Sequence, residues 1–186
     1  MEKILRDSEY LKHQKKKYSF YTLLVLGSML TTYGFGIWLT KTPKNIFTII
    51  AIFLILGVAQ LGVRLIVYLP YKDPSKKWLS QFEKTPLPYV LWNSALLTNG
   101  KNNIFFDGIL IGDSSIHCLS QNKPSNSRKS ENAIIYIFER KGLDNKINFV
   151  YGDKNIRALI STLQENKTMD LSQQKEYIKI IQFHSL

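Results

Sequence analysis

Two long stretches without charged residues dominate the pattern of hydrophobic and polar positions in the first third of the 186-residue chain. Neither residues 18–40 nor residues 46–63 contain Asp, Glu, Lys or Arg, and Arg64 is followed by the apolar run 65–69. A helix of about 20 apolar residues crosses a hydrocarbon layer about 30 Å thick. The short connection from Lys41 to Asn45 allows only a tight reversal. The pattern predicts a membrane hairpin with spans 18–40 and 46–69.

A cleaved signal peptide and a pair of buried soluble helices both fit these residues less well than a membrane hairpin does. A secretory signal peptide has an apolar core of about 7–15 residues followed by small residues, whereas residues 37–41 (IWLTK) offer no such cleavage site. A buried helix of a soluble protein normally carries one polar face. The polar residues here are few and can bond to helical carbonyls or across to the other arm; they include Ser28, Thr31, Thr32 and Gln60.

The charges on either side of the hairpin predict its orientation. The basic N-terminal tail, residues 1–17, holds six basic and three acidic residues, and Lys72, Lys76 and Lys77 follow the second span. The connection holds only Lys41 and Lys44. Since Lys and Arg concentrate on the cytoplasmic side, we expect a multi-pass protein of the cell membrane with both termini cytoplasmic. The tail is either an amphipathic helix on the bilayer or a simple basic anchor. For Arg64 we favour a side chain that reaches the headgroups over a functional charge within the membrane.

Residues 70–186 are long enough for one small cytosolic domain with a helical C-terminus. Asp73 as N-cap and Pro74 as first helical residue predict a short amphipathic helix to about residue 84. A helix from Asp153 presents Ile156, Leu159, Ile160 and Leu163 on one face, and another begins near Leu171. Residues 121–132 contain no apolar side chain, which predicts a flexible loop.

Alternating or continuous apolar runs predict five strands in the same domain. They are residues 89–98, 103–111, 116–120, 133–138 and 147–151. The expected fold is therefore a two-span α-helical membrane hairpin followed by a small mixed α/β (α+β) domain with a mostly antiparallel five-stranded sheet.

Residues 74–122 contain a pattern of apolar strands and one acid that resembles a known family. Phe106-Asp107 ends an apolar segment, residues 109–111 continue as a strand, residues 112–115 form a turn, and residues 116–119 form the next strand. This order is similar to the core of the nuclease-related domain, a branch of the restriction-endonuclease-like superfamily. The resemblance implies that Asp107 occupies the position of the first metal-binding acid, with Glu-x-Lys expected on the following strand.

The chain departs from that family where the chemistry resides. Ser120 and Asn122 occupy the Glu and Lys positions, and residues 73–75 (DPS) replace the Gly-Glu expected at the first helix. Shifting the register to use Lys123 turns that side chain to the opposite face. The resemblance therefore implies a catalytically inactive copy, in which Asp107 is the one candidate catalytic residue. The alternative is that Asp107-Gly108 is a bend with a surface acid.

No other chemistry is indicated. The single Cys118 excludes an internal disulfide and a cysteine-based zinc site, and His13, His117 and His184 lack metal-ligand spacing. We therefore expect no metal and no cofactor. Several cations are candidates for contacts with nucleic acid or lipid headgroups; they are Lys123, Arg128, Lys129, Arg140 and Lys141.

Three functions remain open at this point. The first is a non-catalytic interaction or accessory module anchored at the cytoplasmic membrane face, with the bilayer and an unidentified protein as partners. The second is a membrane-tethered nucleic-acid-binding protein with a decayed nuclease-like fold. The third is an active metal-dependent nuclease, but the chain lacks the acid and the lysine of the Glu-x-Lys pattern. We favour the first.

Overall fold

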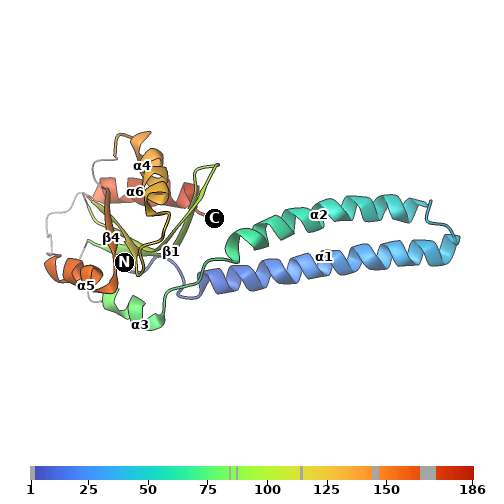
Figure 1. Cartoon of the computed structure of the whole chain (residues 1–186), viewed down its shortest axis with the longest axis horizontal. Helices are drawn as coiled ribbons and strands as arrows, with labels where there is room; N and C mark the ends of the chain where they lie inside the picture. The colour runs from blue at the N-terminus through green and yellow to red at the C-terminus, as the bar shows by residue number, and fades with distance from the viewer. Residues whose placement is uncertain (1–2, 84, 87, 114, 144–146, 164–170) are drawn as a thin grey trace. The chain divides into compact units, whose positions relative to one another are not determined.

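A computed structural model describes residues 3–83, 85–86, 88–113, 115–143, 147–163 and 171–186. The chain forms two compact units (Figure 1). The hairpin comprises Leu11–Lys72, and the sheet domain combines the residues up to Tyr10 with Asp73–Leu186. The residues predicted as a basic tail therefore divide between the two units, because helix α1 begins at Tyr10.

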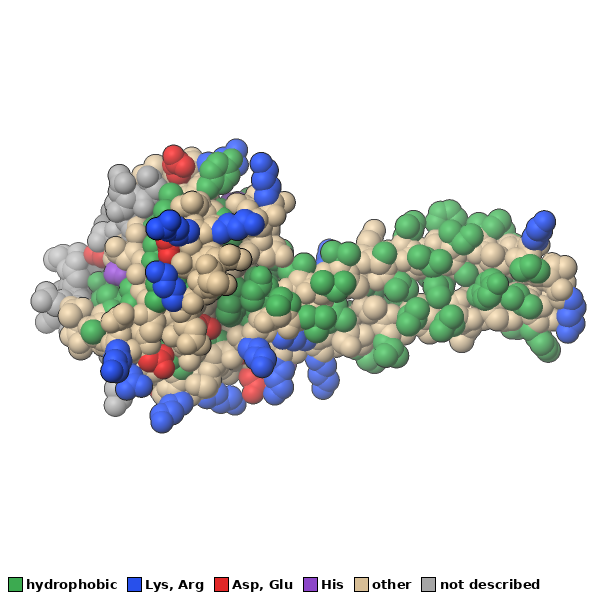
Figure 2. All heavy atoms as spheres, viewed as in Figure 1, with side chains coloured by type: hydrophobic (Ala, Val, Ile, Leu, Met, Phe, Trp, Pro, Cys, Tyr) green, Lys and Arg blue, Asp and Glu red, His purple; other side chains and the backbone are tan. Residues whose placement is uncertain are grey.

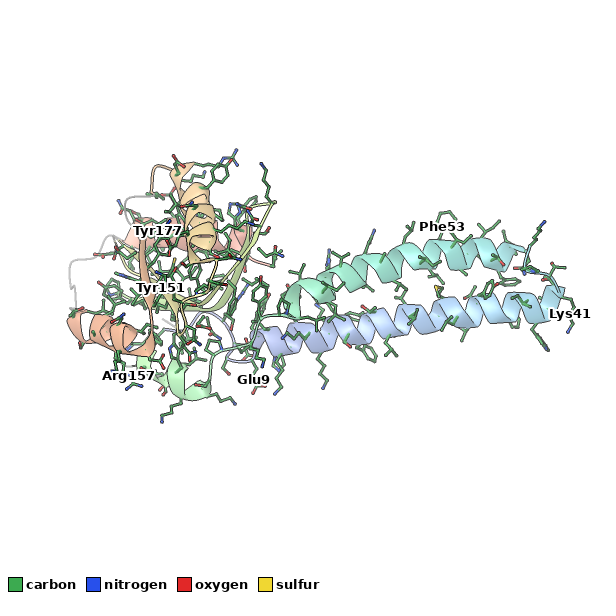
Figure 3. The ribbon with its side chains drawn as sticks, in the orientation of Figure 1. Glu9, Lys41, Phe53, Tyr151, Arg157 and Tyr177 are labelled. Atoms are coloured by element: carbon green, nitrogen blue, oxygen red, sulfur yellow. The ribbon has the colours of Figure 1, made fainter. Side chains whose placement is uncertain are left out.

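The hairpin consists of two long apolar helices, α1 (Tyr10–Thr40) and α2 (Ile46–Tyr68). Both are long and apolar enough to cross a membrane. Hydrophobic side chains lie along both helices on the face that Figure 2 shows, and in Figure 3 Phe53 points away from the partner helix while Lys41 lies at the connecting end. Asn45 caps α2 by accepting a hydrogen bond from the backbone N–H of Thr48 at 3.0 Å.

Aromatic side chains gather near both ends of the hairpin. Tyr18 and Tyr68 stack with ring centres 5.6 Å apart at one end. At the other end, Phe35 contacts both Trp38 and Phe47, with ring centres 5.9 and 5.6 Å away. From Tyr18 to Trp38 the helix rises about 30 Å. This spacing matches the hydrocarbon thickness of a bilayer, at whose two surfaces aromatic residues concentrate.

In the part of the chain that the structure describes, the sheet domain is built on four strands in the order β1-β2-β3-β4. Strands β1 (Val90–Thr98), β2 (Asn103–Ile111) and β3 (Ile116–Ser120) form an antiparallel meander, and β4 (Ile147–Tyr151) pairs with β3 in parallel. The prediction of five strands in a mostly antiparallel sheet was therefore wrong, since the sheet is mixed and has four.

The missing strand is a helix, α4 (Ser127–Glu139), which occupies both the predicted strand 133–138 and the second half of the predicted loop 121–132. Its buried residues follow a helical spacing, and they include Ala133, Ile134, Ile137 and Phe138. The run is rich in Ile and aromatic residues, which suggested a strand. A parallel β3–β4 pair needs a crossover, which is usually helical, and α4 supplies it.

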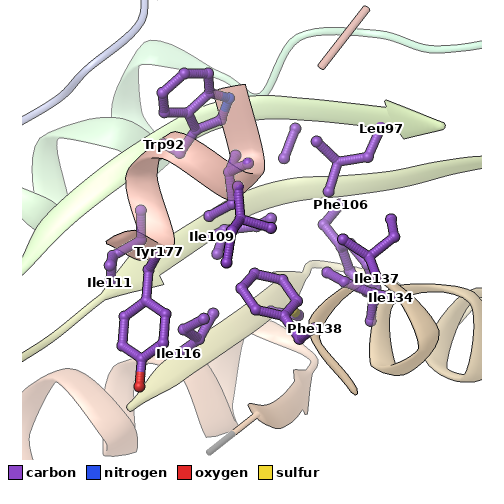
Figure 4. Close-up of a cluster of buried hydrophobic side chains, with 14 of the residues drawn as sticks. Trp92, Leu97, Phe106, Ile109, Ile111, Ile116, Ile134, Ile137, Phe138 and Tyr177 are labelled. Atoms are coloured by element: carbon purple, nitrogen blue, oxygen red, sulfur yellow. The ribbon is translucent and has the colours of Figure 1, made fainter. Parts of the chain in front are cut away.

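Helices cover both faces of the sheet (Figure 1). One core cluster joins the sheet to α4 and α6 (Leu171–His184), and Figure 4 shows Phe138 and Tyr177 packed beside Ile109 and Ile116. The other cluster joins the sheet to α3 (Lys76–Leu79), the 3-10 turn η1 (Ser80–Phe82) and α5 (Asp153–Thr162). Helices α3, α5 and α6 were predicted near their observed positions, although Ser75 rather than Asp73 caps α3.

Segments from both ends of the sequence cover the free edge of β1. The backbone of Leu91 exchanges hydrogen bonds with Lys3 and Leu5, and Leu186 donates its backbone N–H to Leu96 at 3.0 Å. Between these two points, Asn93 Nδ2 donates to the carbonyl of Asp7 at 2.9 Å. Pairing and covering in this way removes a sheet edge that would otherwise be open to another chain.

Candidate functional site

Asp107 lies where β1 and β2 both depart from the regular alternation of side chains between the two faces of the sheet. Phe106 and Ile109 both pack into the core cluster beside α4 and α6, although strict alternation would place residues three apart on opposite faces. Trp92 and Ala95 in β1, which are also three residues apart, likewise both pack into this cluster. Ser94, between them, has a φ of +48°, in the left-handed region. The irregularity thus lies where a bend at Asp107-Gly108 was considered, but Asp107 is partly buried and is not the surface acid of that alternative.

The Asp107 carboxylate is held by the end of β3. Its Oδ2 accepts the backbone N–H of Gln121 at 2.7 Å and faces the Ser120 hydroxyl at 3.5 Å. Burial raises the pKa of Asp107 above its ordinary value, the two hydrogen bonds act to lower it, and the charge of Asp153 raises it further. Asp107 and Ser120 are therefore neighbours on adjacent strands, with a hydroxyl where the nuclease-like pattern requires a second carboxylate.

The surroundings of Asp107 provide little for metal-dependent chemistry. Within the described ranges, no three His, Cys, Asp or Glu side chains come together as a metal site. A cavity of about 580 Å³ beside the ends of β3 and β4 is lined by the neutral amides of Gln121, Asn122 and Asn155. Lys123 also lines it, with its ammonium 5.6 Å from the centre of the Tyr151 ring. The described lining of this cavity therefore offers donors and acceptors of hydrogen bonds and includes no acid.

The five predicted contact cations do not form one patch. Lys123, Arg128 and Lys129 lie before or in the first turn of α4, whereas Arg140 and Lys141 follow its last residue. A helix of 13 residues separates its two ends by roughly 18 Å. The structure thus divides the candidates into two groups at opposite ends of one helix.

Arg140 and Lys141 belong to a larger groove between α4 and α6, with a volume of about 930 Å³. Its apolar surface comes from Ile137, Ile180 and Phe183, and 85% of the Phe183 side chain is exposed. Basic side chains surround this surface, with one acid among them, and the charged lining residues are Arg140, Lys141, Lys175, Glu176 and Lys179. We call this feature the α4–α6 groove.

Helix α6 places its groove residues on one side by a regular spacing. Lys175, Lys179 and Phe183 follow each other at intervals of four, which aligns them along a helix surface. The opposite side is fixed to the sheet: Gln174 is fully buried and its Nε2 donates to the carbonyls of Pro88 and Ile111. Sequence reasoning did not single out Lys175, Lys179 or Phe183, although their spacing was a usable signal.

Searches of protein-family models, curated proteins and solved structures gave no match to this chain.

Proposed function

We propose that this protein is a membrane-anchored, non-catalytic interaction module that binds an acidic amphipathic helix of a partner protein in the α4–α6 groove. The observation that carries the proposal is the groove itself, an apolar surface bordered by four basic side chains and one acidic side chain. The exposed hairpin supplies the anchor, and the sheet domain presents the groove.

Membrane anchoring is supported by the apolar surface of the hairpin. Side chains such as Leu23, Phe53 and Ile66 each expose more than half of their area. In water such surface would cost about 25 cal/mol for each Å². A bilayer removes this cost, and the aromatic residues near both ends match its two interfaces.

Contacts within the sheet domain support the placement of both flanks of the hairpin on the same side of the membrane. Asp7, just before α1, accepts a hydrogen bond from Asn93, and Asp73, just after the hairpin, accepts one from Ser94 at 2.6 Å. Because neighbouring residues of β1 hold both segments, the chain enters and leaves the bilayer at the same face. The excess of Lys and Arg in these flanks over the connecting loop favours the cytoplasmic face.

An acidic amphipathic helix is the partner that complements the groove best. Two packed helices with an apolar floor form a concave surface into which a third helix can lay its apolar face. The basic border then favours Glu and Asp on the flanks of the incoming helix and disfavours a basic one. A flat anionic bilayer complements the charges but not the concave shape.

The test uses the full chain in lipid nanodiscs and a synthetic helical peptide with Leu on one face and Glu on the others. We expect this peptide to bind, and its counterpart with Lys in place of Glu not to bind. The double variant Lys175→Glu/Lys179→Glu should weaken binding about tenfold or more, since reversing charge at an interface introduces repulsion. The matched control Lys154→Glu/Arg157→Glu changes two exposed cations on α5, outside the groove, and should bind as the wild type does.

Three results would contradict the proposal. They are equal binding of the two peptides, equal loss in the control variant, and displacement of the acidic peptide by an oligonucleotide or by anionic vesicles at lower concentrations than by the unlabelled peptide. The last result would assign the groove to nucleic acid or lipid instead.

A further inference from the structure

Arg64 is a cation within the apolar part of α2 whose described surroundings are aromatic. Its Nη1 lies 3.5 Å from the hydroxyl of Tyr18, and its guanidinium lies 5.9 Å from the centre of the same ring. The Lys17 ammonium is also 5.9 Å from that ring centre. Tyr68 stacks on Tyr18 with an angle of 13° between the ring planes. Two cations therefore lie the same distance, 5.9 Å, from one tyrosine ring at the end of the hairpin away from the loop.

The hairpin contains no acid to neutralise these cations. The sequence between Glu9 and Asp73 has no Asp or Glu at all, although it holds eight Lys and Arg residues. Lys15 already uses its ammonium on backbone carbonyls at the end of α2, those of Leu69 at 3.1 Å and of Tyr71. Within the hairpin, then, no acidic side chain supplies a counter-charge for Arg64, which leaves its guanidinium available to a bound anionic group.

The depth of Arg64 identifies the chemistry of that group. It precedes Tyr68 by four residues, which is about 6 Å along the helix. A long Arg side chain at this depth extends toward the headgroup level while its stem stays in hydrocarbon. The planar guanidinium matches the oxygens of a phosphate in a bidentate manner, and a tyrosine hydroxyl can add a further hydrogen bond.

We infer that Arg64, Tyr18 and Lys17 form a binding site for the headgroup phosphate of an anionic phospholipid, in the leaflet at the end of the hairpin away from the connecting loop. Two cations without a neighbouring acid favour a lipid with net negative charge over a zwitterionic one. This inference goes beyond the partner-binding role and depends only on that part of the proposed function which places the hairpin in a bilayer.

The experiment measures which lipids the intact protein retains. The full chain is incorporated in nanodiscs with equal amounts of phosphatidylglycerol and phosphatidylcholine of identical acyl chains, extracted in mild detergent and analysed by native mass spectrometry. We expect preferential retention of phosphatidylglycerol. Arg64→Gln should reduce this preference about fivefold, as expected for the loss of one cation near the lipid surface. Tyr18→Phe keeps the ring and should cause a smaller loss.

Lys44→Gln is the matched control, because it removes a cation at the other end of the hairpin. A preference that survives Arg64→Gln, or that falls equally in the control, overturns the site and leaves only general attraction between charges. Alkaline carbonate extraction of the wild type and of each variant distinguishes a failure of the lipid-site proposal from a failure of the membrane-anchor proposal. A wild-type protein released by carbonate overturns both proposals, whereas a retained protein without lipid preference overturns only the site.

Discussion

Phe53 in α2 and Phe106 in β2 are the same residue type in opposite surroundings. The side chain of Phe53 is 68% exposed on the hairpin, whereas that of Phe106 is 1% exposed in the core of the sheet domain. The hairpin thus directs its apolar residues outward and the domain directs them inward. Under the proposed anchoring, lipid covers the apolar side chains of the hairpin, whereas the protein interior covers those of the sheet domain.

The largest expected effect is a difference in stability between alanine variants of these two phenylalanines. Phe106→Ala should lower the free energy of unfolding of the sheet domain by about 3–5 kcal/mol, since it leaves a cavity in a packed core. Phe53→Ala removes the same atoms from an exposed position and should leave the domain unchanged. Thermal unfolding of the full chain in detergent micelles measures both. Similar losses in the two variants would mean that Phe53 packs as a core residue does.

An acidic substitution at an exposed position tests whether the hairpin faces lipid or water. Ile55 and Tyr136 are exposed to similar extents, 50% and 48%. Ile55→Asp in α2 should disfavour membrane insertion by about 2.5–3.5 kcal/mol, whereas Tyr136→Asp in α4 meets water and should be tolerated. The fraction of protein that resists carbonate extraction reports insertion. Unchanged extraction of Ile55→Asp would remove the evidence for a lipid-facing helix.

Arg6 tests how the segment before the hairpin is held to the sheet domain. Its guanidinium donates to the carbonyl of Ser94 at 3.1 Å and lies 3.8 Å from the ring centre of Tyr10 and 5.0 Å from that of Trp92. Arg6→Gln should cost about 1.5–3 kcal/mol of domain stability, the range for hydrogen bonds to charged groups. Chemical denaturation measures the loss, and Arg157→Gln on the exposed surface of α5 is the control. A loss equal to that of the control would show that these contacts contribute nothing.

The smallest effect concerns Asp107 and depends on pH. Because its pKa is raised in the folded state above the ordinary 3.8, folding favours the protonated form, and this contribution to stability is lost as the pH rises through the folded pKa. Asp107→Asn lacks this dependence. We therefore expect the variant to gain stability relative to the wild type between pH 3.8 and neutrality, as measured by thermal unfolding across that range. A constant difference would contradict the raised pKa.

The same pair of proteins also tests the nuclease-like resemblance. Neither Mg²⁺ nor Mn²⁺ should change the unfolding temperature of either form, and neither should support cleavage of DNA or RNA, since Ser120 lies beside Asp107 at the position where the resemblance expects the second acid. Metal-dependent cleavage that Asp107→Asn abolishes would restore the enzyme and end the module proposal.

The sequence predicted those parts of the fold that depend on local pattern. The two helices of the hairpin follow from uninterrupted apolar length, and the three strands of the meander follow from apolar runs separated by turn residues. The strand predicted at residues 133–138 was wrong because Ile and aromatic residues suit both a strand and a buried helix over so short a run. Only the parallel pairing of β3 with β4, a long-range feature, requires a helix between them.

The candidate site divides in the same way. The contact of Asp107 with Ser120 was expected only through the family resemblance, and the register that pairs Gly108 with Leu119 brings the two residues together. The α4–α6 groove was not, because it needs the position of α4, which was predicted as a strand, relative to α6. The predicted cations were consequently grouped by nearness in the sequence, although a helix keeps Lys123 and Arg140 apart.

The edge of β1 has a consequence for the order in which the protein is made. Ile4 bridges to Leu91, and Asp7 bonds to Asn93, a residue 86 positions later. A ribosome therefore synthesises both helices of the hairpin before the partner of the first described residues exists. Those residues stay unpaired until β1 emerges, so that a segment made before the hairpin joins the domain only after the hairpin has been made.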